Sequence, residues 1–409
     1  MTTPMKRYWI AINLTWLLVV AVLGGLMRGT FTGATGGFHY EYALHTHSHV
    51  AFIGWVYQTL FVALVSRFLD AEQIRRGRYV LQLAITQILV VGMLAAFWLQ
   101  GYAAASIALS SVFQVVSYWF AWRLWRDGRE HVEGRHRFSW RFVQVSLLAM
   151  VLSSFGPWGL AAVVANGLQD SPYYSMAIYF YLHFQYNGWF VFGLLALLFA
   201  ALESTGRAVT ERYARWGFAL LAVGLFPAYA MSIPHLAPSP ATDLLAWGSG
   251  AAQVAGIVLL TAWGWRERER LGGLPRPWPA RLLLGIAAAA MVAKFVLQLL
   301  SLAPGLAEIT FGNRHVIIAF IHLVVLGGIT FALLGLLPVQ GLLRMDGWVA
   351  GVGVVLLTAG FLWTEWLLVA PVLGVASAHM FPFLYSSGIL MACGIAAIWI
   401  AQFRFGRFA

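Results

Sequence analysis

Charged side chains are scarce in this sequence: Asp, Glu, Lys and Arg together make up 10% of its 409 residues. A soluble domain carries about a quarter charged residues, because its surface must be solvated by water. Apolar residues reach 61% here, and the mean hydropathy is +0.77. The composition therefore predicts a protein whose surface faces lipid, and it excludes an ordinary soluble enzyme.

Cysteine is almost absent as well. Cys393 is the one cysteine of the sequence, which excludes an intrachain disulfide and a cysteine-rich metal site. Long polar stretches are also missing, so no segment can form a separate soluble domain. We therefore expect residues 1–409 to form a single transmembrane domain.

Apolar stretches long enough to cross a bilayer, about 20 residues each, recur along the whole chain. The sequence predicts an all-α, polytopic membrane protein of about twelve transmembrane helices. The expected spans are residues 8–27, 43–66, 79–100, 102–124, 142–166, 173–200, 213–233, 242–264, 281–303, 314–338, 347–370 and 381–402. The first is expected to be a retained helix, because no small-residue cleavage site follows it.

The net charge of +11 comes from arginines in short loops between these spans. They gather in alternate loops, after the second, fourth, sixth, eighth and tenth spans, and after the last one. The opposite loops carry little positive charge beyond Arg28 and Arg314. By the positive-inside rule we expect both termini in the cytoplasm and the chain in the cell inner (cytoplasmic) membrane. The expected partner of these charges is membrane lipid, not nucleic acid.

Most of the eleven histidines fall in the outer half of the predicted bundle. Two lie in the Arg-rich loop after the fourth span; the other nine are His39, His45, His47, His49, His183, His235, His315, His322 and His379. Ionisable groups in a membrane are costly and mark functional sites by default. Imidazole is a common ligand of haem iron, copper and zinc. For any one histidine a hydrogen-bonded structural role is the alternative.

Two of these histidines, His183 and His322, lie about ten residues below the outer ends of their helices, about 15 Å deep at 1.5 Å per residue. His47 and His49 lie a little shallower in the second span. Because His45 and His49 are four residues apart, they share one helix face, and His47 points away from it. Two histidines on facing helices at similar depth can clamp a haem between them.

Four short motifs resemble those of the haem-copper oxidase catalytic subunit, most closely the cbb-type oxidases and the nitric oxide reductases. They are HSHVAFIGW at residues 47–55, YLHFQYNGW at 181–189, PHL at 234–236 and IHLVVLG at 321–327. Their order along the chain matches the family across all twelve predicted helices. The NnrS family of haem- and copper-containing membrane proteins is similar in length and helix count.

The resemblance implies a low-spin b-type haem between the second and tenth spans, with His47 and His322 as its axial ligands and His49 as the competing choice to His47. It also implies a second metal site, of copper or non-haem iron, on His183 and His235. An electron donor on the outer side and a diatomic gas, O2 or NO, would be the partners of a reductase.

The sequence departs from the family at the second site. The family carries His-x-His on the tenth helix, but Phe320 stands where the high-spin haem ligand is expected, and Leu236 replaces the second histidine of the seventh span. His183, His235 and His315 remain as candidates for a mononuclear metal site. His49 and His379 are possible substitute haem ligands.

Three other ionisable groups fall within or beside the spans. Lys294 lies in the middle of the ninth span, where a proton-conducting role competes with a structural hydrogen-bonded one. Glu365 lies in the outer part of the eleventh span, within reach of a histidine. Arg314 is a candidate for a haem propionate or an interfacial anchor.

Three functions follow from these features. The first is a haem-binding redox protein that reduces or binds O2 or NO; the second is a non-catalytic haem protein that carries electrons or senses a gas. The third is a secondary transporter that uses Lys294 and Glu365. Secondary transporters tend to show internal repeats; the sequence shows no clear repeat, so this function ranks last.

Overall fold

The computed structural model describes residues 3–131, 137–206, 209, 211–274, 277–375 and 379–403. Within these ranges the chain is helical with no strand, and eleven helices are long and apolar enough to cross a membrane. The expectation of an all-α polytopic membrane protein is confirmed.

The chain divides into two units, each described by itself. Residues 1–123, 275–287 and 321–409 form unit 1, which contains α1 (Thr3–Gly29), η1 (Thr30–Thr32), α2 (Tyr40–His49), η2 (Val50–Tyr57), α3 (Gln58–Phe68), α4 (Ala71–Arg76), α5 (Tyr79–Gln100), η5 (Leu323–Thr330), α17 (Phe331–Val339), α18 (Trp348–Val369), η6 (Ala370–Leu373), α19 (Met380–Ile400) and η7 (Ala401–Phe403). Residues 124–274 and 288–320 form unit 2, which contains α7 (Arg137–Ser153), α8 (Phe155–Ala165), α9 (Pro172–Leu182), η3 (His183–Phe190), α10 (Val191–Glu203), α11 (Arg212–Leu225), η4 (Pro227–Ser232), α12 (Pro240–Arg266), α13 (Arg268–Gly272) and α15 (Pro304–Gly312). Three helices belong partly to each unit: α6 (Ala104–His131), α14 (Trp278–Leu300) and α16 (Arg314–His322).

The seventh expected span, residues 213–233, is not one continuous helix. The helix α11 ends at Leu225, and Pro227 begins the 3-10 segment η4. Proline has no backbone N–H and disfavours helical conformation in the residue before it, so the α-helical ladder stops there. This break exposes carbonyl groups that a continuous helix would have satisfied.

Three spans share a feature that the sequence had not indicated. Each contains an eight-residue π-helical segment, η2, η3 or η5, which begins at or directly after a histidine: His49, His183 or His322. In each case glycine follows that histidine by five residues, as in the pairs His49–Gly54, His183–Gly188 and His322–Gly327. The short pattern His-x-x-x-x-Gly therefore recurs in these three spans. π-Helical turns occur frequently at functional sites.

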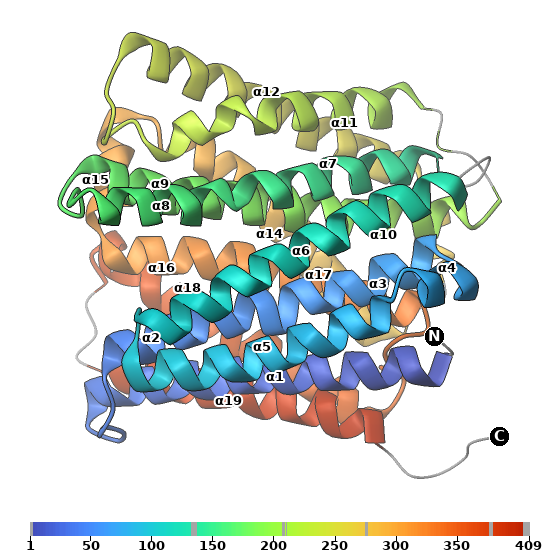
Figure 1. The fold of residues 1–409 in the computed structure, drawn as a ribbon, viewed down its shortest axis with the longest axis horizontal. Coiled ribbons are helices and arrows are strands. Elements are labelled where there is room, and N and C mark those ends of the chain that lie inside the picture. Colours follow the sequence, from blue (N-terminus) through green and yellow to red (C-terminus); the bar gives the residue numbers. More distant parts are fainter. Residues whose placement is uncertain are drawn as a thin grey trace. The chain divides into compact units, whose positions relative to one another are not determined.

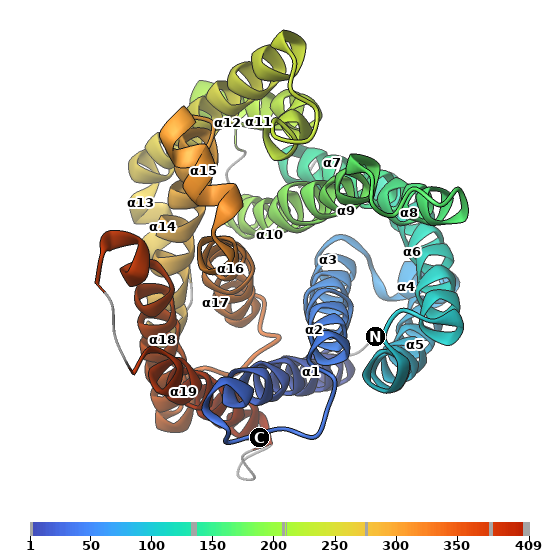
Figure 2. The same ribbon diagram turned by 90° about the vertical axis from the view of Figure 1, so that its left-hand side faces the viewer.

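Small residues set the packing of the helices in unit 1. The helices α18 and α19 run side by side (Figure 2), and a Cβ on Gly394 would lie only 2.5 Å from the backbone nitrogen of Leu357. Glycine thus lets two backbones approach closely, as in other membrane helix pairs. A different device serves η5, where Gly327 makes room for the ring of Phe361.

Unit 2 is held together by packed aromatic rings. Phe142 stacks on Phe199 with ring centroids 4.9 Å apart, and Phe199 stacks on Trp263 at 4.7 Å. These rings come from α7, α10 and α12, so the cluster joins three helices. Trp189, in the π-helical segment η3, is fully buried, and its backbone carbonyl accepts a 2.7 Å hydrogen bond from Ser146 on α7.

Candidate functional site

His47 lies near the end of α2 in unit 1, with its ring oriented by the neighbouring helix α1. Its Nδ1 is 3.0 Å from the carbonyl oxygen of Val20. Because a carbonyl only accepts hydrogen bonds, Nδ1 carries the proton, which leaves the lone pair of Nε2 available. Metal-binding histidines are held in this way, with one ring nitrogen donating to a fixed acceptor. A Cβ on Gly24 would lie 3.3 Å from Cε1 of His47, so glycine there gives the imidazole its room.

His322 is the last residue of α16 and also belongs to unit 1. Its Nδ1 is buried and has no hydrogen-bond partner among the described residues. A buried imidazole nitrogen without a partner is unusual in a folded protein and asks for an explanation. His47 lies within electrostatic reach of His322.

A buried hydrogen bond holds these two histidine-bearing helices in register. The indole Nε1 of Trp55 donates to Oγ1 of Thr330 at 3.0 Å. Trp55 follows His47 by eight residues, and Thr330 follows His322 by eight residues. The hydrogen bond therefore joins the two helices at equivalent positions, eight residues after each histidine.

His49, the alternative haem ligand, is engaged differently. Its Nδ1 donates to the carbonyl oxygen of His45 at 2.9 Å, and its Nε2 faces the hydroxyl of Tyr102 at 3.4 Å. The ring also stacks on Phe97, with centroids 4.1 Å apart. Both ring nitrogens of His49 are thus used by protein groups, whereas His47 keeps one for a ligand.

Arg28, on α1, connects the histidine pair to the helices α18 and α19. One of its guanidinium nitrogens donates to Thr364 Oγ1 at 3.2 Å and also to two oxygens on α19. Its charge acts on His47, on His322 and on the carboxyl of Glu365. Oε1 of Glu365 is buried without a hydrogen-bond partner in the part of the chain that the structure describes. From the sequence, Arg28 was expected only to be a rare charge of the outer side, and its rarity there was the available signal.

The metal site expected in unit 2 is centred on His183, which is fully buried. Its Nε2 donates to the carbonyl oxygen of Leu225 at 2.8 Å, and its Nδ1 accepts from the amide of Asn187 at 3.0 Å. Leu225 is the last residue of α11, and because the helix breaks at Pro227 its carbonyl has no hydrogen-bond partner within the helix. The imidazole of His183 supplies that partner. Asn187, which the sequence analysis missed, lies four residues after His183 on the same helix face.

The other two candidates of unit 2 do not join His183 in a cluster. His235 is exposed and packs against Phe311, with ring centroids 4.3 Å apart. His315 is half-buried, and its backbone N–H donates to the side chain of Asn313. Across the described ranges, no group of three or more His, Cys, Asp or Glu residues is arranged to hold a metal ion. The structure thus does not bring the three histidines together, and the expected second metal site stays a prediction.

Lys294, on α14, is fully buried in unit 2. Its Nζ has no hydrogen-bond acceptor among the described residues and lies 3.6 Å from the centroid of the Phe295 ring. One turn further along, Oε1 of Gln298 is also buried without a partner. The charge of Lys294 acts on His183, so the two side chains lie in the same part of the unit. The choice between a proton-conducting and a structural role for Lys294 stays a prediction.

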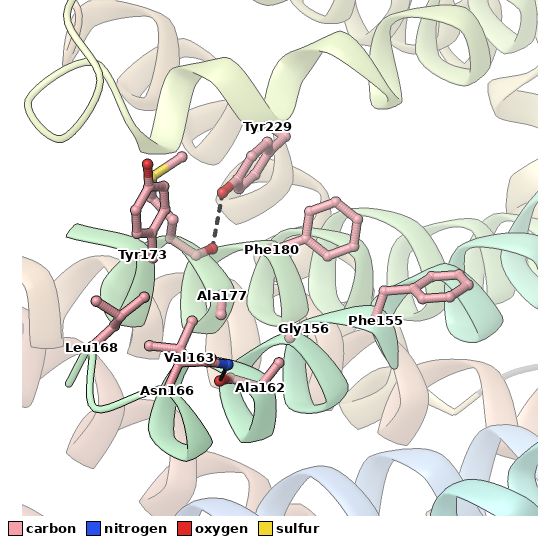
Figure 3. Close-up of a pocket in the computed structure, with 12 residues that line it drawn as sticks. Phe155, Gly156, Ala162, Val163, Asn166, Leu168, Tyr173, Ala177, Phe180 and Tyr229 are labelled. Carbon is pink, nitrogen blue, oxygen red and sulfur yellow. Dashed lines mark hydrogen bonds between the residues drawn. The ribbon is translucent and has the colours of Figure 1, made fainter. Parts of the chain in front are cut away.

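A pocket in unit 2 has a different character. It has a volume of about 410 Å³ and lies between α8, α9 and η4, where Phe155, Phe180 and Tyr229 face it (Figure 3). Its lining is mostly apolar, and the hydroxyl of Tyr229 is used in a 2.9 Å hydrogen bond to the carbonyl oxygen of Met176. Asn166 and Tyr173 are its other polar residues, and the lining contains no histidine, cysteine or carboxylate.

Comparison with solved structures assigns the fold. The chain is similar to a haem-copper terminal oxidase that forms a dimer, with a TM-score of 0.67 over 99% of this chain and 85% of that chain. The chain has a haem-copper oxidase fold. Sequence identity over the match is 12%, so the likeness concerns the fold alone. No protein-family model matches the sequence, and no curated protein matches it either.

Proposed function

We propose that this protein is a membrane haem protein that transfers electrons, with one six-coordinate b-type haem held between His47 and His322. The observation that carries the proposal is the unequal state of the histidines. In unit 1 the Nε2 of His47 is left available by a hydrogen bond on Nδ1, and His322 lies within electrostatic reach of it. The haem-copper oxidase fold supports the same assignment, because members of that superfamily bind haem.

The residues present fit a haem at this place. His47 and His322 would supply the two axial ligands, and the cation of Arg28 would lie close enough to attract the negative charge of a propionate. The hydrogen bond between Trp55 and Thr330 would keep the two ligand-bearing helices in register. A haem bound there supplies one-electron redox chemistry.

Electron transfer is favoured over gas reduction for two reasons. A haem iron held by both His47 and His322 would have no position left for O2 or NO. In unit 2, both ring nitrogens of His183 are committed to Leu225 and Asn187, which leaves no support for a second metal centre. We therefore propose that this protein resembles the cbb-type oxidases, the nitric oxide reductases and the NnrS proteins in architecture, and that it does not itself reduce O2 or NO.

The proposed setting is the cell inner membrane, with both termini in the cytoplasm. The distribution of arginines between alternate loops supports this orientation. The haem would then lie in the outer half of the membrane, and an electron donor on the outer side would have the shorter path to it.

An optical spectrum of the detergent-purified protein tests the proposal. We expect a sharp α band on reduction, because bis-histidine b-type haems are low-spin, and no spectral change on addition of CO. The absence of any haem band from protein produced with added haem precursor would refute the proposal. A CO-sensitive band would instead show an open iron position and would favour gas binding or reduction.

A further inference from the structure

A groove in unit 2 lies at the end of the α11–α12 pair that carries arginines. The two helices run side by side (Figures 1 and 2). Their close approach depends on glycine: a Cβ on Gly217 would lie 2.7 Å from Leu260 Cδ2, and one on Gly256 would lie 2.9 Å from Leu221 Cγ. Beside this contact is a hollow of about 490 Å³.

The lining of the groove changes in polarity along α11. Arg212, Tyr213 and Trp216 line it along the start of α11, and Leu220, a turn further along α11, lines it together with Leu259 of α12. These α11 positions fall on one helix face, and eight residues of helix span about 12 Å. Charge, aromatic rings and aliphatic side chains therefore follow one another in the order in which a membrane presents headgroup, interface and hydrocarbon.

A second arginine is fixed at the same end. The guanidinium of Arg266 lies over the ring of Tyr213, 4.2 Å from its centroid, and donates to the Tyr213 hydroxyl at 3.3 Å. Arg212 is exposed and has no ion pair among the described residues. Two cations thus lie at this end of the groove, Arg212 in its lining and Arg266 over the ring of Tyr213, which also lines it.

The nearby carboxylates are largely occupied by one another and by a different arginine. Glu267 accepts a hydrogen bond from Arg270 at 3.3 Å and also contacts the carboxyl of Glu211. Arg270 is held further by the carbonyl oxygen of Leu202. Arg266 lies within electrostatic reach of Glu211, but neither arginine of the groove forms a salt bridge in the described structure.

We propose that this groove binds one anionic glycerophospholipid, with the phosphate between Arg212 and Arg266 and one acyl chain along Leu220 and Leu259. Charge complementarity selects this occupant, because two arginines without carboxylate partners match an anionic phosphate. The apolar end requires a hydrocarbon chain on the same molecule, which free phosphate lacks. The exposed indole of Trp216, 55% accessible, would contact the glycerol and ester region between them.

The test uses the full-length protein, stripped of lipid in detergent and titrated with phosphatidylglycerol or phosphatidylcholine of the same acyl chains. Binding is followed by native mass spectrometry. We expect phosphatidylglycerol to bind more tightly than phosphatidylcholine. Each of R212Q and R266Q should weaken phosphatidylglycerol binding about fivefold, and the double variant about thirtyfold, because each arginine near a membrane surface contributes about equally to the attraction.

Two further variants separate the site from general surface charge. R215Q removes an exposed arginine of α11 that does not line the groove, and it should change binding less than twofold. Leu259→Trp fills the apolar end without changing any charge, and it should weaken binding of both lipids. Equal affinity of the wild type for the two lipids would overturn the proposal. So would an R215Q effect as large as that of R212Q, or unchanged binding in the Leu259→Trp variant.

Discussion

Replacing Thr330 by Val should loosen the two helices that carry the proposed haem ligands. The hydroxyl of Thr330 accepts the 3.0 Å hydrogen bond from Trp55, and the two residues are 2% and 1% exposed. Valine keeps the shape of threonine but leaves the buried indole N–H unpaired. An unsatisfied buried donor costs about 1–3 kcal/mol, which is a factor of about 5 to 150 in the unfolding equilibrium.

The assay is thermal or denaturant unfolding of the purified protein, with haem retention measured in parallel. Thr358→Val is the matched control, because Oγ1 of Thr358 is buried without a partner in the described structure, and its removal should be neutral or stabilising. The double variant Trp55→Phe/Thr330→Val removes donor and acceptor together. It should be less destabilised than the sum of the two single changes. Equal stability of the Thr330→Val and Thr358→Val variants would refute the reasoning.

Three further outcomes are expected. Gly24→Val should displace the His47 ring and shift or abolish the haem bands, whereas Gly25→Val, which meets nothing within 4 Å, should leave them unchanged. Lys294→Met should stabilise the protein by about 1–3 kcal/mol in unfolding assays, because an apolar side chain replaces a buried polar one without a hydrogen-bond acceptor; destabilisation would show that the amine has a partner. Burial, together with Glu267, raises the pKa of Glu211, so the ionised carboxylate destabilises the folded state. Glu211→Gln should therefore raise the melting temperature near neutral pH, and this gain should vanish as the pH falls below about 4, where Glu211 is protonated in both states. A gain that persists at low pH would contradict this cause.

The membrane architecture followed from the sequence because composition and span length are properties of the chain itself. Ten of the expected spans correspond to one long helix each, and an eleventh, residues 142–166, continues from α7 into α8. The seventh failed as a continuous helix because Pro227 stands within an otherwise apolar run. Hydropathy averaged over a span does not detect that proline lacks a backbone N–H, although the proline itself was visible in the sequence.

The site was harder to predict, because it depends on which nitrogen of each histidine is already used. His47 and His49 are two residues apart and equivalent as sequence symbols. They differ because Val20 of another helix accepts from one ring, while His45 and Tyr102 engage both nitrogens of the other. These partners are set by packing between helices, which no local pattern encodes.

The backbone conformation of the π-helical segments was equally hard to predict from the sequence. Nothing in the composition of residues 50–57, 183–190 or 323–330 distinguishes a π-helix from an α-helix. The recurrence of His-x-x-x-x-Gly was nevertheless readable. A search for short repeats centred on histidine, rather than for long homologous halves, would have found it.

The most direct test measures bound haem per chain after each of three histidines is replaced by alanine. His47→Ala and His322→Ala should each lose the haem or convert it to a high-spin form, since each removes one axial ligand. His49→Ala should retain a full complement of low-spin haem. Loss of haem from the His49→Ala variant with retention in the His47→Ala variant would contradict the assignment, and full low-spin haem in all three variants would place the cofactor elsewhere.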